Sequence, residues 1–234
     1  QKWYIIAIDN AGNRTVASKT TSNIDTEAPV ISDLQASQEW DADKNIVTLQ
    51  VSEENTLEKV YYSAIDKYEE GSESLIELKG TDGRYSFEAL ENGMYYIFAV
   101  DGAGNVGKAS VEVNRIDDKN PEIKHVVKNI DGEWNKDKIF IYVHGEDSES
   151  GISKVFYSTK YDSYEEAVDN KELLEAINEN GVYRIHVPEE EFNGKYYIWA
   201  VDGVDRVSET ASIDIKIDRT PPTGLKLTYI EDKD

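Results

Sequence analysis

The residues of this chain best suited to chemistry are its carboxylates. Asp and Glu number 47 against 25 Lys and Arg, which leaves a formal net charge of −22. Carboxylate oxygens bind hard cations such as Ca²⁺ and serve as general acids and bases. The same charge repels the phosphates of nucleic acids and of anionic membranes, so we expect no nucleic acid as a partner.

The remaining inventory of catalytic groups is small. The chain has no cysteine, and none of its histidines, His125, His144 and His186, has a serine or carboxylate at the spacing of a catalytic triad. No HExxH motif, phosphate-binding glycine loop or dinucleotide fingerprint is present. No apolar run approaches the roughly 18 residues that cross a bilayer. We therefore expect neither an enzyme nor membrane insertion of this segment.

The elements that must position the carboxylates are repeated along the chain. Three blocks are alike: YIIAIDNAGN at 4–13, YIFAVDGAGN at 96–105 and YIWAVDGVDR at 197–206. Each block is followed by an alternating stretch and by an Ile-Asp linker that ends in a proline. The isoleucines that begin these linkers, Ile24, Ile116 and Ile217, repeat at the same spacing as the blocks. Two signals in register define a domain of about 100 residues.

The repeats predict the domain boundaries. We expect complete domains at 26–117 and 118–218, the C-terminal hairpin of a truncated domain at 1–25, and the start of a following domain at 219–234. The single Met94 and the missing leader signal at the first residues indicate a piece of a longer protein.

The sequence between linkers predicts an all-β fold. Residues with β-branched or aromatic side chains alternate with polar ones, and turn residues interrupt them about every ten positions. Seven such segments in the first complete domain favour a tandem array of Ig-like, seven-strand, two-sheet β-sandwiches. The expected strands are 30–35, 46–52, 58–64, 74–79, 84–89, 94–100 and 108–115, then 122–127, 138–145, 153–159, 182–187, 195–201 and 208–217.

The second complete domain is predicted to contain a short inserted helix near 164–178. Ser163-Tyr164-Glu165-Glu166 forms a capping box, and Gly181 follows as a stop signal. Four apolar residues share one helical face: Ala167, Val168, Leu174 and Ile177. We expect this helix to replace a strand or loop at the edge of the sandwich.

The Asp-x-Ala-Gly-Asn segments are interpreted first as tight turns between the last two strands. Gly12 and Gly104 can take positive φ, and the preceding aspartate can accept backbone N–H bonds across the turn. Asp205 replaces the glycine in the second complete domain, which predicts a more open turn there.

Several motifs together resemble the tandem bacterial Ig-like repeats of Gram-positive cell-surface and secreted proteins. The resemblance covers essentially the whole chain and implies an extracellular or cell-surface location, with neighbouring Ig-like domains of the same chain as partners. The first complete domain departs from it at 52–57, which lacks a Ser-Gly-Ile element, and the second at 204–206. The motifs are Trp134-Asn135-Lys136-Asp137, the alternating 139–143, Asp147 to Ser158, Tyr197 to Asp202, and Ile217-Asp218 with Pro221.

A calcium site at each domain junction is the functional interpretation of the acids. In an Ig-like sandwich the first strand begins at the end of the domain that also carries two loops, the one between the second and third strands and the one between the sixth and seventh. The resemblance implies calcium as well, because junctional calcium rigidifies some related bacterial repeats. Ca²⁺ takes six to eight oxygen ligands, and such acids would repel one another without a cation. Solvated acids at a hinge are the alternative. The candidate ligands are Asp25, Glu53, Asp101 and Asn105 at the first junction, and Asp117, Asp118, Asp147, Asp202 and Asp205 at the second.

Two tryptophans occupy matching places before the second strand of each domain. We interpret Trp40 and Trp134 as core plugs or lids, so Trp134→Ala is expected to cost about 3–5 kcal/mol of stability. Stacking on a sugar is the alternative.

The function predicted from these features is a non-catalytic spacer or adhesin stalk that presents a distal functional region. The three or four residues between each linker isoleucine and its proline predict an extended rod. The alternative is an accessory module of a secreted hydrolase that binds host glycan or protein.

Overall fold

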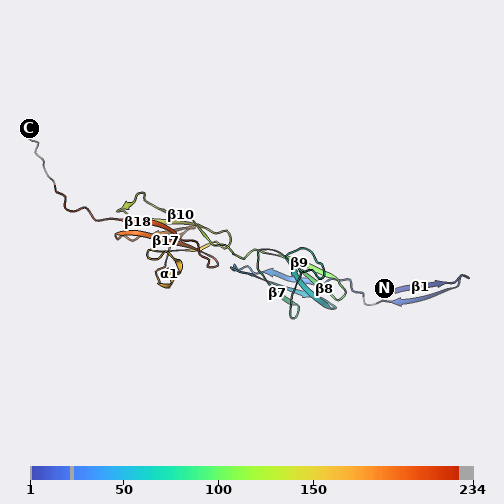
Figure 1. Cartoon of the computed structure of the whole chain (residues 1–234). Helices are drawn as coiled ribbons and strands as arrows, with labels where there is room; N and C mark the ends of the chain where they lie inside the picture. Colours follow the sequence, from blue (N-terminus) through green and yellow to red (C-terminus); the bar gives the residue numbers. More distant parts are fainter. Residues whose placement is uncertain (1, 22–23, 227–234) are drawn as a thin grey trace, which may run out of the picture. The chain divides into compact units, whose positions relative to one another are not determined.

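A computed structural model describes residues 2–21 and 24–226 (Figure 1). The chain forms two compact units, residues 1–116 and 117–234. The first unit begins with an antiparallel hairpin of β1 (Lys2–Ile8) and β2 (Arg14–Thr20), which forms a sheet of its own. After the last strand, the described residues 218–226 contain no strand. The rest of the domain predicted at 219–234 lies outside the described residues.

All seven strands predicted for the first complete domain are present. One sheet has the order β3-β4-β7 and the other β6-β5-β8-β9. The fourth strand pairs with the third, unlike the constant-type Ig arrangement, in which it joins the opposite sheet. The strands are β3 (Val30–Ala36), β4 (Asn45–Ser52), β5 (Leu57–Ser63), β6 (Ile76–Glu77), β7 (Arg84–Ala89), β8 (Gly93–Asp101) and β9 (Val106–Val113).

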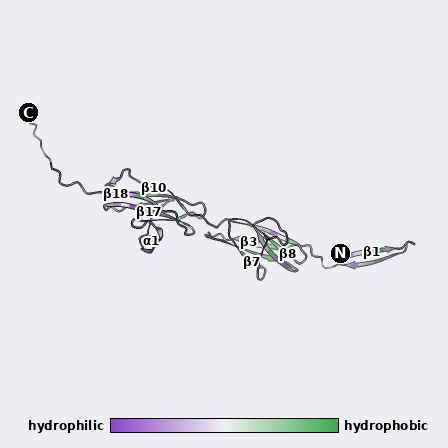
Figure 2. Ribbon diagram, viewed as in Figure 1, coloured by the Kyte–Doolittle hydropathy of each residue, from purple (hydrophilic) through white to green (hydrophobic). Residues whose placement is uncertain are grey.

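The core of this sandwich follows from side-chain alternation along the strands. In β4, Val47, Leu49 and Val51 are buried while the intervening residues face outward. This is the period-2 pattern of a strand with one face on the core. The apolar stretch at the end of β8, which Figure 2 colours as hydrophobic, is buried throughout. β8 lies inside its sheet, between β5 and β9, and Tyr68 packs against Phe98 of this strand.

The second unit repeats the plan with additional edge strands. Its sheets have the orders β10-β12-β16-β15 and β11-β18-β17-β13-β14. The six predicted strands are confirmed as β10 (Glu122–Lys128), β12 (Phe140–Glu146), β13 (Ile152–Ser158), β16 (Val182–His186), β17 (Phe192–Asp202) and β18 (Ala211–Ile217). Three short strands were not predicted: β11 (Trp134–Asn135), β14 (Leu174–Glu175) and β15 (Ile177–Glu179).

The inserted helix is shorter than predicted. Helix α1 covers only Tyr164–Asp169, and Ser163 caps it as expected by accepting a bond from the Glu166 amide. The helix ends at Asn170, and Lys171 takes a left-handed φ of 59°.

The segment after α1 is extended, so the prediction of a helix to 178 is wrong. Strand β14 pairs with β13 just as β6 pairs with β5 in the first unit, and β15 pairs with β16. The helix is therefore an insertion that leaves the fourth strand in place. The described part of the chain contains no helix long and apolar enough to span a membrane.

Candidate cation sites in the two units

The Asp-x-Ala-Gly-Asn segments form the predicted turns. In the hairpin, Asp9 Oδ1 accepts the backbone N–H groups of Ala11 and Asn13, both at 2.9 Å, while Oδ2 accepts the Asn13 side-chain amide at 2.9 Å. Gly12 has a φ of 86°. Both carboxylate oxygens of the aspartate are therefore satisfied within five residues.

The same turn joins β8 to β9. Asp101 Oδ1 accepts the N–H groups of Ala103 and Asn105, and Oδ2 accepts the Asn105 side-chain amide at 2.7 Å. Gly104 also has a φ of 86°.

The third copy of the turn, at the end of β17, has a different set of side chains but the same backbone. Asp202 Oδ1 accepts the N–H groups of Val204 and Arg206, both at 2.9 Å, and the Asp202 N–H donates to the Arg206 carbonyl. Asp205 takes the left-handed φ of 66° that glycine takes in the other copies. The expected more open turn is therefore wrong, because aspartate tolerates this conformation better than most residues.

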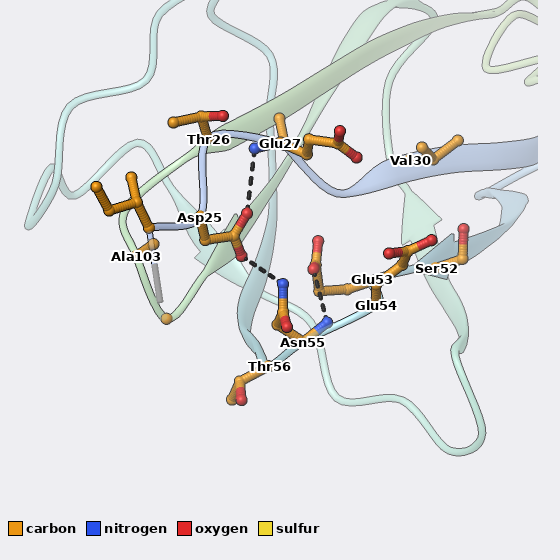
Figure 3. Close-up of a pocket in the computed structure, with 13 residues that line it drawn as sticks. Asp25, Thr26, Glu27, Val30, Ser52, Glu53, Glu54, Asn55, Thr56 and Ala103 are labelled. Carbon is orange, nitrogen blue, oxygen red and sulfur yellow. Dashed lines mark hydrogen bonds between the residues drawn. The ribbon is translucent and has the colours of Figure 1, made fainter. Parts of the chain in front are cut away.

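In the first unit, the linker, the β4–β5 loop and the end of β8 bring three carboxylates together. Oxygens of Asp25, Glu53 and Asp101 lie within 4.8 Å of one another. Asp25 Oδ2 accepts the Asn55 side-chain amide at 2.8 Å, and Glu53 Oε1 accepts the Asn55 backbone N–H at 2.9 Å (Figure 3). Asp25 and Glu53 border an open hollow of about 1050 Å³, which is lined mostly by linker and loop residues.

Asn105 donates a hydrogen bond to the most buried of these acids, Asp101. Its side-chain amide donates to Asp101 and, more weakly, to the carbonyl oxygens of Asp25 at 3.4 Å and Glu27 at 3.2 Å. Burial would raise the pKa of Asp101, but the bonds from Asn105 and the turn amides outweigh it and lower that pKa. Asn105 was predicted as a cation ligand, whereas here its nitrogen occupies the place beside the carboxylate.

The second unit builds its cluster from the matching positions. Asp117 stands before β10, Asp147 follows β12, and Asp202 ends β17. One carboxylate oxygen of each lies within 4.8 Å of the other two. Asp117 and Asp202 are both 0% exposed, and Asp147 is partly buried.

Each of these three aspartates has one oxygen held by turn or loop amides. Asp117 Oδ1 accepts the Lys119 N–H at 3.1 Å, and Asp147 Oδ1 accepts the Gly151 N–H at 2.7 Å. Asp117 Oδ2 accepts both the backbone N–H and the hydroxyl of Ser150. Asp147 Oδ2 and Asp202 Oδ2 are buried and accept no hydrogen bond from any residue that the structure describes.

The charges of the cluster act on one another. Burial raises the pKa of Asp202, and the negative charges of Asp117 and Asp147 raise it further against the bonds from the turn amides. Burial also opposes ionisation of Asp117, yet the bonds from Ser150 and Lys119 lower its pKa. Asp117 therefore keeps its charge more readily than Asp202.

Two predicted ligands lie outside the cluster. Asp118 and Asp205 are exposed, and neither belongs to a three-carboxylate group within residues 2–21 and 24–226. The Asp118 backbone N–H instead donates to Glu149, which also pairs with Lys119 at 2.7 Å.

Sequence reasoning missed the donors that surround the acids. Asn55 and Ser150 each bond the linker aspartate of their unit, and Arg206 Nε donates to the Asp117 carbonyl at 2.8 Å. The positions were visible in the sequence as the loop and turn residues nearest each acid. Their side-chain directions were not.

The predicted burial of the matched tryptophans is wrong for Trp134. Its side chain is 55% exposed and lies beneath the Lys216 ammonium, 5.8 Å from the ring centroid. Trp40 is partly buried and stacks with Arg115. The segment of Trp134 pairs in parallel with β18, and Asp41, next to Trp40, forms a parallel bridge with Ile116, so both segments lie along an edge of a sheet.

Comparisons with known proteins find similarity at the level of structure alone. No family model and no curated protein matches the chain. The fibronectin(III)-like modules of Clostridium thermocellum CbhA match with 18% identity over 85% of this chain and 100% of theirs, at a TM-score of 0.35. Titin domains A168–A170 match with 12% identity over 89% of this chain and 72% of theirs, at a TM-score of 0.46. Titin Z1Z2, solved in complex with telethonin, matches with 15% identity over 86% and 100% of the two chains, at a TM-score of 0.35. The strand orders of the two sheets in each unit are those of an Ig-like β-sandwich.

Proposed function

We propose that this chain is a non-catalytic spacer or adhesin-stalk segment of a Gram-positive bacterial surface protein, located outside the cell. It presents a distal functional region through consecutive Ig-like domains. The support is the tandem sandwich plan, the acidic composition and the resemblance of the repeated motifs to bacterial surface repeats.

One observation carries the proposal most directly, the anchoring of consecutive residues in different units. Ile116 is 4% exposed in the first core, and its N–H and carbonyl both bond the Asn92 side chain, at 3.0 and 2.7 Å. The next residue, Asp117, is 0% exposed in the second unit and is held by Ser150. A linker without free residues favours a stiff connection, which suits a spacer.

The test is a distance distribution between the two units. Because the chain has no cysteine, Glu58→Cys and Asp169→Cys at exposed positions accept one spin label each. We expect a narrow distribution in the full chain. The matched control inserts Gly-Ser-Gly-Ser between Ile116 and Asp117 and should broaden it. A wild-type distribution as broad as that of the insertion variant would contradict the spacer proposal.

Exposure of Trp134 favours a second candidate, a glycan-binding accessory module. Its ring is 55% exposed, and aromatic faces stack on sugars. A glycan array probed with the full chain and with Trp134→Ala tests it. Binding that the substitution abolishes, without a change in melting temperature, would favour the module over the spacer.

A further inference from the structure

We propose that the second unit binds one Ca²⁺ between Asp117, Asp147 and Asp202, and that Asn105 closes the corresponding place in the first unit. The chain then takes up one equivalent of calcium rather than two. This inference goes beyond the spacer proposal and does not depend on it.

Two buried carboxylate oxygens in the second unit have no hydrogen-bond partner among the described residues. Asp202 is 0% exposed, and its Oδ2 and the Oδ2 of Asp147 are buried without a hydrogen bond from any described residue. A buried polar atom without a partner costs about 1–3 kcal/mol, and a charged one costs more. Both aspartates belong to the three-carboxylate group, so a cation bound by that group would supply the missing partner.

The spacing of the three aspartates suits a single Ca²⁺. Two oxygens that bind the same Ca²⁺ at 2.3–2.6 Å can be at most about 5.2 Å apart. One carboxylate oxygen from each of the three aspartates lies within 4.8 Å of the other two, so the group fits around one ion. All three donors are hard oxygens, which Ca²⁺ prefers. Zn²⁺ prefers nitrogen and sulfur donors, and Mg²⁺ is reluctant to lose the waters that a buried site would displace.

The first unit differs from the second in that the matching aspartate oxygen has a hydrogen-bond donor. There the Asn105 amide donates to Asp101 Oδ2 at 2.7 Å, and Asp101 is as buried as Asp202. The matching residue in the second unit is Arg206, whose Nε donates to the Asp117 carbonyl at 2.8 Å. The Asn105 amide thus satisfies Asp101 Oδ2 in the first unit. In the second unit, with Arg206 in place of the asparagine, Asp202 Oδ2 accepts no hydrogen bond from a described residue.

The experiment is calcium titration of the full chain by calorimetry, with thermal unfolding in parallel. We expect a stoichiometry near one and a higher melting temperature for the second unit alone. When free Ca²⁺ is a hundredfold above its dissociation constant, the unfolding equilibrium constant of that unit should fall about a hundredfold. Asp202→Asn should abolish binding, and the matched variant Asp101→Asn in the first unit should leave it intact.

A second variant keeps the proposal testable if Asp202→Asn does not fold. Arg206→Asn restores the amide donor of the first unit and should abolish calcium binding while the chain remains folded. Three outcomes would overturn the inference: no heat and no melting shift at millimolar Ca²⁺, a stoichiometry of two, or an equal shift with Mg²⁺ or NaCl. The first outcome would mean that the cluster binds no calcium, and the last would mean charge screening.

Discussion

Trp199, and not Trp134, is the tryptophan that stabilises the second unit. Trp199 is 1% exposed, its indole N–H donates to the Thr210 hydroxyl at 2.8 Å, and Tyr164 packs edge-on against it at 5.8 Å. The first unit has Phe98 at the matching place, with Tyr68 against it at 5.7 Å. Both sandwiches therefore share an aromatic residue of β8 or β17 packed against a tyrosine from the segment that follows β5 or β13.

We predict that Trp199→Ala lowers the free energy of unfolding of the second unit by about 3–5 kcal/mol, because it leaves a large cavity. Trp134→Ala should cost less than about 1 kcal/mol, since it removes an exposed ring and one cation–π contact. Urea denaturation measures both. An equal loss in free energy of unfolding for the two substitutions would indicate that Trp134 is a core residue after all.

A second residue-scale prediction concerns stability in alkali. Burial raises the pKa of Tyr196 from 10.0 to about 12. The folded state therefore holds the proton more tightly than the unfolded chain, so the stabilisation is complete below pH 10 and is lost as pH rises toward 12. Tyr196→Phe cannot ionise and should reduce this slope in urea denaturation between pH 9 and 11.5. An unchanged slope would assign the alkaline loss to other tyrosines.

At the scale of elements, the strand-joining turns are built by their own residues. Gly104 has a φ of 86° with nothing within 4 Å of the place a Cβ would occupy, so a substitution there acts through backbone strain alone. Asp205 occupies the matching position in the second unit at a φ of 66°. The turn therefore tolerates aspartate.

We predict that Gly104→Ala destabilises the first unit by about 1–2 kcal/mol and that Gly104→Asp costs less, because aspartate adopts left-handed φ more readily than alanine. Thermal unfolding of the two variants, compared with the wild type, measures the difference. The reverse order would show that the added carboxylate repels the neighbouring acids more than it relieves strain.

At the scale of the whole molecule, each unit has its own core. Ile97 and Ile198 occupy the same place in the repeated block, and both are 0% exposed. The core cluster of each unit draws on residues of that unit alone.

We predict that Ile97→Ala lowers only the unfolding transition of the first unit and Ile198→Ala only that of the second, each by about 2–5 kcal/mol. Differential scanning calorimetry of the full chain separates the two transitions. Hydrogen exchange of buried amides assigns each transition to its unit. A single transition that both substitutions lower equally would mean that the units unfold together.

The sequence by itself determined the features whose bonds close within a few residues. The alternation of β4 specifies its buried face, and the Asp-x-Ala-Gly-Asn turns satisfy Asp9 and Asp101 with amides at most four positions away. The Ser163 cap is equally local, and α1 begins where the capping box predicted. Such features are predictable because hydrogen bonding and side-chain period act within one element.

Tertiary structure decided what depends on neighbours distant in the chain. Ile5 in the β1–β2 hairpin is 73% exposed, whereas Ile97 in the same repeated block is 0% exposed, because only β8 has a second sheet packed over it. The residues predicted as the second half of the helix became β14 and β15 because partner strands accept their backbone bonds. The acids were visible in the sequence. Which of their carboxylate oxygens lack a hydrogen bond depends on the donors that surround them in the folded chain. Asn105 and Arg206 differ in this respect, and only the folded chain places their side chains.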